Sequence, residues 1–278
     1  MATNNQHLHH KKCYSTEVLR FDSGLFDTCV DMTYVLTMEG SDRKNGFMTQ
    51  LKTHKPASTV TIQYNKGFRK CDKKNIKSSE YDITDALRNI FVGAVEKNYQ
   101  RILVFEDDFF MDKTKYTSED IDSICKFVKD KNPDVYNLGT LIHFSLPSFN
   151  NHHLAAAMGH AHSVIYNAKY MRTFIKDVNK GKIKHCDEYW NRVKFSKYSY
   201  TYPIVFQLFP ETENMKTWPV WRIANSWLKY WKLDKTNEHY GQHFQLSLNM
   251  PWILIICTIV LITVLVLCLC MGKKTKIV

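Results

Sequence analysis

Three consecutive carboxylates, Glu106, Asp107 and Asp108, are the residues of this 278-residue chain best suited to chemistry. They follow the apolar run ILVF (102–105) and precede two phenylalanines. Adjacent negative charges repel one another, so such a cluster at the mouth of a buried strand is unfavourable unless a cation or bound protons neutralise it. Because side chains alternate between the faces of a strand, we expect Glu106 and Asp108 to point together and Asp107 to point away.

The cluster indicates a site for a hard divalent cation. Mg²⁺ and Mn²⁺ prefer oxygen ligands and commonly share their coordination shell with substrate phosphates. In open α/β sheets, ligands bind beyond the carboxyl ends of the strands, where this cluster is predicted to lie. His162 is a candidate for one further ligand. On the triplet alone, an acidic turn with solvated side chains is an equally good interpretation.

Strand and helix patterns alternate along the chain and predict an α/β fold, a Rossmann-type mixed sheet flanked by helices. Residues 1–27 are predicted to be irregular. Strands are predicted at 32–38, 58–64, 102–106, 134–139, 162–167 and 199–207. Helices are predicted near 42–53, 83–99 and 168–178, with another capped by Ser118.

The order of several motifs adds a resemblance to a known family. The motifs are VTIQYNKGF (60–68), DITDALRNIFVGAVEKNY (82–99), ILVFEDDF (102–109), DVYNLG (134–139), GHAHSVIYNAKYMRTFI (159–175), CDEYW (186–190) and YPIVFQ (202–207). Across residues 30–218 the chain resembles glycosyltransferase family 25, the lipopolysaccharide-biosynthesis and procollagen galactosyltransferase group, of GT-A type. Two stretches depart from the family pattern. LTMEGSDRK (36–44) keeps only Arg43 of an arginine-rich turn, and Ser163 stands where the family has tyrosine.

The resemblance implies a role for each candidate residue. Glu106 and Asp108, with His162 as a further ligand, would hold Mn²⁺ or Mg²⁺ against the diphosphate of a nucleotide sugar, with UDP the expected nucleotide. Arg43, Asp107 and Gln207 would contact the donor.

An inverting transfer needs one general base near the acceptor hydroxyl. Asp187 is the first candidate for this base and Glu188 the second. For Asp187 and Glu188 an acidic helix start, and for Gln207 a buried structural amide, are the competing interpretations.

The function expected from these residues is a metal-dependent glycosyltransferase, a hexosyltransferase for galactose or glucose. Its partners would be a nucleotide sugar, a protein, glycan or lipid acceptor, and a lipid bilayer. The alternative is a catalytically degenerate transferase fold that acts as an anchored binding or scaffold protein. A two-metal nuclease or phosphatase ranks last, because acidic residues at further strand ends are few. No nucleic-acid recognition motif occurs, so no nucleic acid is expected as a partner despite the net charge of +11.

The C-terminal segment WILIICTIVLITVLVLCLCM (252–271) carries no charge and predicts a transmembrane helix. The predicted organisation is an irregular segment at 1–27, a glycosyltransferase-like domain at 28–220, a stalk at 221–250, the span at 251–271 and a basic tail at 272–278. The expected location is therefore a membrane, with a single-pass C-terminal anchor. Orientation stays open, because the absence of a signal peptide favours a cytosolic domain, whereas the ending KTKIV resembles an ER-retrieval signal that requires a cytosolic tail.

Five cysteines precede the apolar segment, namely Cys13, Cys29, Cys71, Cys125 and Cys186. Their number is odd, their spacing is wide, and they form no Cys-x-x-Cys pair. This pattern predicts neither a disulfide framework nor a zinc site, and it favours a cytosolic domain.

Overall fold

A computed structural model describes residues 11–73, 76–140, 143–146, 150–159, 162–183, 185–192, 195–208, 226, 229, 230, 249, 252, 253 and 255–269. In this part of the chain, nine strands form one mixed sheet in the order β1-β3-β2-β4-β9-β6-β10-β8-β7, and β5 pairs with β11 in a second, two-stranded sheet. The strands are β1 (Tyr14–Arg20), β2 (Met32–Met38), β3 (Thr59–Asn65), β4 (Arg101–Glu106), β5 (Phe109–Met111), β6 (Val135–Asn137), β7 (His143–Leu146), β8 (His152–Met158), β9 (Ser163–Asn167), β10 (Lys197–Tyr200) and β11 (Val205–Gln207).

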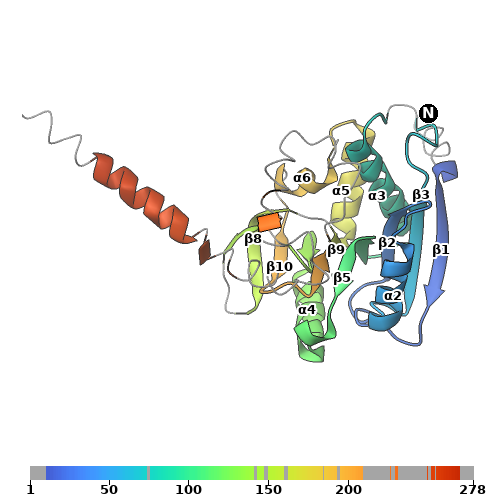
Figure 1. Ribbon diagram of the computed structural model, residues 1–278, viewed down its shortest axis with the longest axis horizontal. Helices are drawn as coiled ribbons and strands as arrows, with labels where there is room; N and C mark the ends of the chain where they lie inside the picture. Colours follow the sequence, from blue (N-terminus) through green and yellow to red (C-terminus); the bar gives the residue numbers. More distant parts are fainter. Residues whose placement is uncertain are drawn as a thin grey trace, which may run out of the picture.

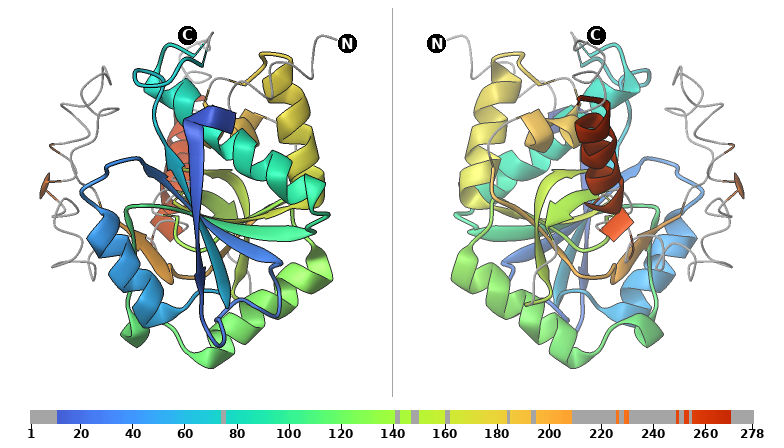
Figure 2. Two further views of the ribbon diagram at one scale, coloured as in Figure 1. Left: turned by 90° about the vertical axis from the view of Figure 1, so that its right-hand side faces the viewer. Right: turned by 90° about the vertical axis from the view of Figure 1, so that its left-hand side faces the viewer.

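Helices cover both faces of the large sheet (Figure 1, Figure 2). The helices are α2 (Lys44–His54), α3 (Ser79–Glu96), α4 (Ser118–Lys131), α5 (Ala168–Asn179) and α6 (Cys186–Arg192), with short 3₁₀ turns η1 (Lys11–Cys13) and η2 (Lys113–Lys115). Helices α3, α5 and α6 pack over one face in a core that includes Phe91, Phe174 and Trp190. Helices α2 and α4 contribute to the core on the other face. The structure is therefore a three-layered mixed α/β fold, as the alternating patterns predicted.

Several strands in the middle of the large sheet run in the same direction and therefore end at the same edge. Strands β3, β2 and β4 run parallel, with Val35 beside both Ile62 and Phe105. Strand β9 pairs antiparallel with both β4 and β6, and β10 runs parallel to β6. The carboxyl ends of β2, β3, β4, β6 and β10 consequently share one edge of the sheet, where open α/β folds bind ligands. We call this the carboxyl edge.

Some predicted elements differ from the structure. Strand β1 lies within 1–27, which was predicted to be irregular, and it pairs with β3 as a polar edge strand. The predicted strand 199–207 is two strands, β10 and β11, because Pro203 between them lacks the N–H that a continuous ladder needs. Strands β7 and β8 were not predicted, and the side-chain cap of α4 is Thr117 rather than Ser118.

The predicted transmembrane helix at 251–271 is wrong, and with it the single-pass membrane anchor. Crossing the hydrocarbon core of a bilayer takes about 20 helical residues. Among the residues that the structure describes, no helix is long and apolar enough for this, and the helical run near the C-terminus covers 255–269. The tail at 272–278 and nearly all of the predicted stalk at 221–250 lie outside the described residues.

The prediction that the cysteines form no disulfide framework is also wrong. Cys13 forms a disulfide with Cys71, and Cys29 forms one with Cys125. Cys186 is buried and takes part in neither disulfide. The spacing argument failed because the fold brings together cysteines that lie 58 and 96 residues apart in sequence.

Candidate functional site

The acidic triplet lies at the carboxyl edge, partly in a strand and partly in a turn. Strand β4 ends at Glu106, and Asp107 and Asp108 form a turn before β5 begins at Phe109. The backbone N–H of Glu106 donates to the carbonyl oxygen of His162 at 3.0 Å, so the strand pairing ends here too. Asp107 and Asp108 therefore lie beyond the strand, and the expectation that Glu106 and Asp108 point together stays a prediction.

Asp107 closes the loop between β2 and α2. Its Oδ2 accepts hydrogen bonds from the hydroxyls of Thr37 (2.6 Å) and Ser41 (3.0 Å). Its Oδ1 accepts from the Arg43 guanidinium at 2.8 Å, in an ion pair that is largely shielded from solvent. Arg43 and Asp107 were both predicted to contact the donor, and the structure brings them together. In the structure they bind each other and shape the loop.

Asp108 is the most perturbed carboxylate of the site. It is 5% exposed, and its Oδ2 accepts from the Gln207 side-chain amide at 3.1 Å. Its Oδ1 and the Gln207 Oε1 are buried without a hydrogen-bond partner. The pKa of Asp108 is raised to about 7, mainly by burial and to a smaller extent by the negative charge of Asp107. A carboxylate in this state is poised either to keep a proton or to bind a cation.

A pocket of about 280 Å³ opens beside the Asp107 hydrogen bonds at the ends of β2 and β3. Its lining consists of residues 37–41, Ser15, Lys44 and Tyr64. The Lys44 ammonium lies 5.0 Å from the centre of the Tyr64 ring. Glu17 accepts from the Tyr64 hydroxyl (2.6 Å) and from Lys44 (3.1 Å), and these bonds hold the pKa of Glu17 below its usual range.

The first turn of α2 lies beside this pocket, which Lys44 lines. The helix begins at Lys44, and Arg43 before it makes no side-chain cap. Backbone N–H groups at an uncapped helix start, together with the helix dipole, favour an anionic ligand. The pocket lining therefore combines the Lys44 ammonium, which is paired with Glu17, the Tyr64 ring and one acidic residue, Glu39.

A larger pocket of about 540 Å³ lies elsewhere on the molecule. Residues 23–25, which precede β2, and 53–55, which precede β3, contribute to its wall. It therefore lies toward the opposite edge of the sheet from the acidic triplet. We take the smaller pocket, next to Asp107, as part of the candidate site.

His162 is buried at 0% exposure. Its ring Nε2 lies 3.4 Å from the carbonyl oxygen of Val205. A Cβ on Gly139 would come within 2.9 Å of the same nitrogen, so the ring is packed between β6 and β11. Its role as a metal ligand stays a prediction.

Asp187 and Glu188 lie on α6, which packs against α3 and β8. Glu188 is exposed. Their helix belongs to the layer of α3 and α5, whereas Gln207, the partner of Asp108, lies on β11 beside β5. Their role as general base stays a prediction.

The oxygen atoms near Asp108 fit a hard divalent cation in part. Asp108 Oδ1 and Gln207 Oε1 are buried oxygens without partners, and Glu106 is half-buried at the same strand end. Within the described residues, however, no group of three or more His, Cys, Asp or Glu side chains could hold a metal alone. A Mg²⁺ or Mn²⁺ here would therefore need water and substrate phosphate to complete its shell.

Sequence reasoning did not identify Thr37, Ser41, Lys44 and Tyr64 as site residues. Thr37 and Ser41 lie at and just after the end of a strand that was predicted correctly. Hydroxyl residues at this place in the sequence are the signal that could have identified them. Lys44 and Tyr64 meet through the pairing of β2 with β3, which the sequence does not reveal.

Comparisons with known proteins give little more. No protein-family model matches the chain, and no curated protein matches it. Among solved structures, the chain is similar to a glycosyltransferase involved in the glycosylation of the major capsid of PBCV-1. The match has 10% sequence identity and a TM-score of 0.35 over 61% of this chain and 82% of that chain. A likeness at this level carries no argument about function.

Proposed function

We propose that the chain is a glycosyltransferase that moves a sugar from a nucleotide-sugar donor to an acceptor hydroxyl of a protein, glycan or lipid. The observation that carries the proposal is Asp108, a buried carboxylate with an unpartnered oxygen at the end of a central parallel strand. The preceding residue, Asp107, binds Thr37 and Ser41, which also line the neighbouring pocket. The order of family-like motifs along residues 30–218 supports the same reading.

In this proposal the pocket at the ends of β2 and β3 holds the donor diphosphate. Lys44 and the first turn of α2 would offset its negative charge. Tyr64 offers a ring face for the nucleoside, which is expected to be uridine. The Arg43–Asp107 pair would act indirectly, because it holds the β2–α2 loop in the conformation that forms the pocket wall.

Asp108 and Gln207, with Glu106, would hold Mn²⁺ or Mg²⁺ beside the diphosphate. When bound, the cation would supply positive charge against the leaving nucleoside diphosphate. The raised pKa of Asp108 predicts that a proton competes with the cation below about pH 7. We propose inversion at the anomeric carbon, with Asp187 or Glu188 as the base that takes the acceptor proton.

The test uses the full chain, a panel of nucleotide sugars, Mn²⁺ and a set of acceptors that includes hydroxylysine peptides, glycans and lipid-linked sugars. The release of nucleoside diphosphate is measured with and without a chelator. Asp108→Asn is compared with Asp122→Asn, which changes an exposed carboxylate on α4. Metal-dependent release that is lost only in Asp108→Asn would support the proposal and would identify the donor.

Direct binding separates the remaining outcomes. Nucleoside diphosphate that binds in a calorimeter, without turnover for any donor and acceptor pair, would favour the degenerate fold that serves as a binding protein. Failure to bind any nucleotide or Mn²⁺ would exclude the transferase.

A further inference from the structure

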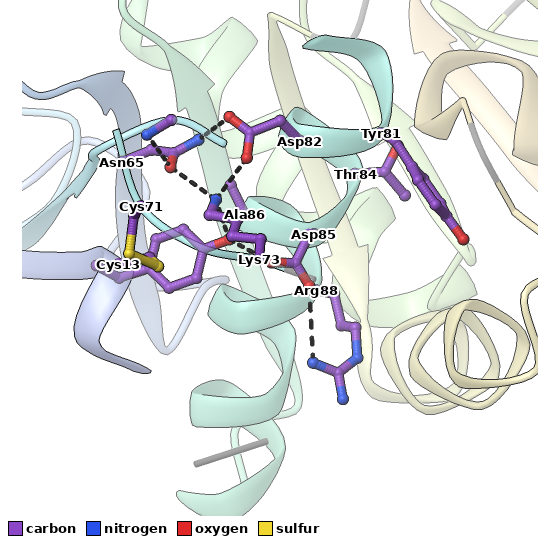
Figure 3. A network of polar contacts seen from close by, with 12 residues as sticks. Cys13, Asn65, Cys71, Lys73, Tyr81, Asp82, Thr84, Asp85, Ala86 and Arg88 are labelled. Atoms are coloured by element: carbon purple, nitrogen blue, oxygen red, sulfur yellow. Dashed lines mark hydrogen bonds and ion pairs between the residues drawn. A yellow bond between two sulfur atoms is a disulfide. The ribbon is translucent and has the colours of Figure 1, made fainter. Parts of the chain in front are cut away.

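Lys73 is a buried cation behind the candidate donor pocket. It is 2% exposed, and its Nζ donates to Asp82 Oδ1 (2.5 Å), Tyr14 Oη (2.7 Å) and Asn65 Oδ1 (2.8 Å). Figure 3 shows the Lys73 ammonium between Asn65 and Asp82. Lys73 thus joins the start of β1, the end of β3 and the first turn of α3.

The acceptors of Lys73 are themselves held in place. Asp82 Oδ2 accepts from the Asn65 amide at 2.9 Å, and Asp85 Oδ2 accepts from the Tyr14 hydroxyl at 2.6 Å. Burial lowers the pKa of Lys73, while the Asp82 carboxylate acts in the opposite direction. If Lys73 moved away, the Asp82 carboxylate would stay buried without its cation, which is strongly unfavourable. The contacts therefore favour a single position of Lys73.

A disulfide fixes the loop that carries Lys73. Cys71 lies two residues before it and is bonded to Cys13, which immediately precedes β1, with 5.7 Å between the Cα atoms. Figure 3 shows this disulfide beside the Lys73 contacts. The loop also closes on itself, because the Cys71 N–H donates to the Gly67 carbonyl oxygen at 3.0 Å. We call residues 66–73 the cystine loop.

The cystine loop reaches the pocket wall through Gly67 and Asn65. Gly67 has a φ of +76°, and a Cβ there would come within 2.7 Å of the Met38 methyl group. The Gly67 N–H donates to Asn65 Oδ1 at 2.9 Å, the same oxygen that accepts from Lys73. The Asn65 carbonyl oxygen accepts from the Glu39 N–H at 2.8 Å, and Met38 and Glu39 line the pocket. One continuous set of contacts therefore runs from the disulfide to the pocket.

We infer that Lys73 is a positioning residue for the donor pocket and that the Cys13–Cys71 disulfide is a redox-sensitive latch that keeps it in place. The inference rests on the proposed function only for the identity of the ligand, a nucleoside diphosphate. Reduction by a dithiol transfers two electrons to the Cys13–Cys71 bond, yields two thiols, and converts the dithiol to its own disulfide. The cystine loop then loses its covalent attachment to the start of β1, and Lys73, Asn65 and the Met38–Glu39 wall become mobile together.

The second disulfide provides a matched control. Cys29–Cys125 connects the segment before β2 to α4 and belongs to the core on the other face of the sheet. The double variants Cys13→Ser/Cys71→Ser and Cys29→Ser/Cys125→Ser each remove one disulfide. In the second variant, a dithiol has only the latch to reduce, so latch opening can be followed in a protein that folded with the latch closed.

The experiment combines a ligand-free and a ligand-dependent measurement on the full chain. Amide hydrogen exchange is followed at residues 37–44 and 60–73, and UDP binding is measured by calorimetry, each before and after treatment with a dithiol. Opening the latch is expected to accelerate exchange at residues 37–44 at least tenfold and to weaken UDP binding about tenfold or more. Removal of Cys29–Cys125 alone is expected to change either quantity by less than about twofold. Lys73→Met, with the latch intact, is expected to give the same two changes.

The outcomes are distinguishable. Unchanged exchange at residues 37–44 after reduction of Cys13–Cys71, with thiols counted by mass spectrometry, would overturn the latch. An equal loss of UDP affinity on removal of either disulfide would also overturn it, because the effect would then be general destabilisation. Accelerated exchange in a protein that binds no UDP in any state would support the latch and contradict the proposed function.

Discussion

Replacement of Asp108 by asparagine is expected to stabilise the fold at neutral and alkaline pH, although it removes the side chain that is central to the proposed activity. Burial and the charge of Asp107 raise the pKa of Asp108 from an ordinary 3.8 to about 7. Between these values the folded protein keeps a proton that the unfolded chain has already lost, so the free energy of unfolding falls as the pH rises. The full penalty, reached above pH 7, is roughly 4 kcal/mol.

Asparagine has nearly the same shape and stays neutral, so the variant avoids this penalty. Both proteins are unfolded with urea at pH 4, 6, 7 and 8, and the free energies of unfolding are compared. We expect similar stability at pH 4 and an advantage for Asp108→Asn at pH 8 that approaches 4 kcal/mol. Other titrating groups are common to both proteins and largely cancel in the difference.

Two results would refute this reasoning. If the free energies of unfolding of the two proteins changed with pH in the same way, ionisation of Asp108 would cost nothing in the folded state. A less stable variant at pH 8 would mean that the carboxylate has a partner that the structure does not contain. Addition of Mn²⁺ at pH 8 tests the second case, because a cation that binds only the folded wild type at a hundred times its Kd would add about 2.7 kcal/mol.

Other substitutions test the packing around the site. Lys73→Met leaves Asp82 buried without its cation, and we expect urea denaturation to show a loss of about 3–5 kcal/mol, most of which Asp82→Leu in the same chain should restore. Gly139→Ala would place a Cβ within 1.7 Å of the Val205 carbonyl oxygen, so we expect a loss of at least about 3 kcal/mol, whereas a smaller loss would mean that β11 moves easily. Gly93→Ala is the matched control, because nothing lies within 4 Å of its Cβ position, and we expect its melting temperature to rise with a gain of about 0.5–1 kcal/mol.

The elements that the sequence predicted well are those whose pattern follows from burial. Strand β2 was predicted with both bounds correct, and β4 with an error of one residue, because both are central, apolar strands. Strand β1 was missed because an edge strand with alternating polar residues resembles a loop. Strands β7 and β8 were missed because histidine and small residues carry little strand signal.

The sequence identified several residues of the candidate site, but it predicted few of the contacts between them. The position of the triplet at the end of β4 follows from local sequence, whereas the ion pair of Arg43 with Asp107 joins residues 64 apart. The contact between Asp108 and Gln207 joins residues 99 apart, and no local pattern encodes it. Strand β4 ends at Glu106, two residues before the end of the triplet, and a difference of this size lies within the usual error of a predicted boundary.

The two disulfides overlap along the chain, since Cys29 lies inside the loop closed by Cys13 and Cys71, while Cys125 lies outside it. During synthesis, Cys13 and Cys29 emerge before either of their partners. An oxidant that joined these cysteines in order of appearance would therefore link Cys13 to Cys29 and Cys71 to Cys125, which is one of the two non-native connectivities of four cysteines. Native pairing then requires thiol–disulfide exchange. The yield of correctly folded protein is consequently expected to depend on a disulfide isomerase more than on the supply of oxidant.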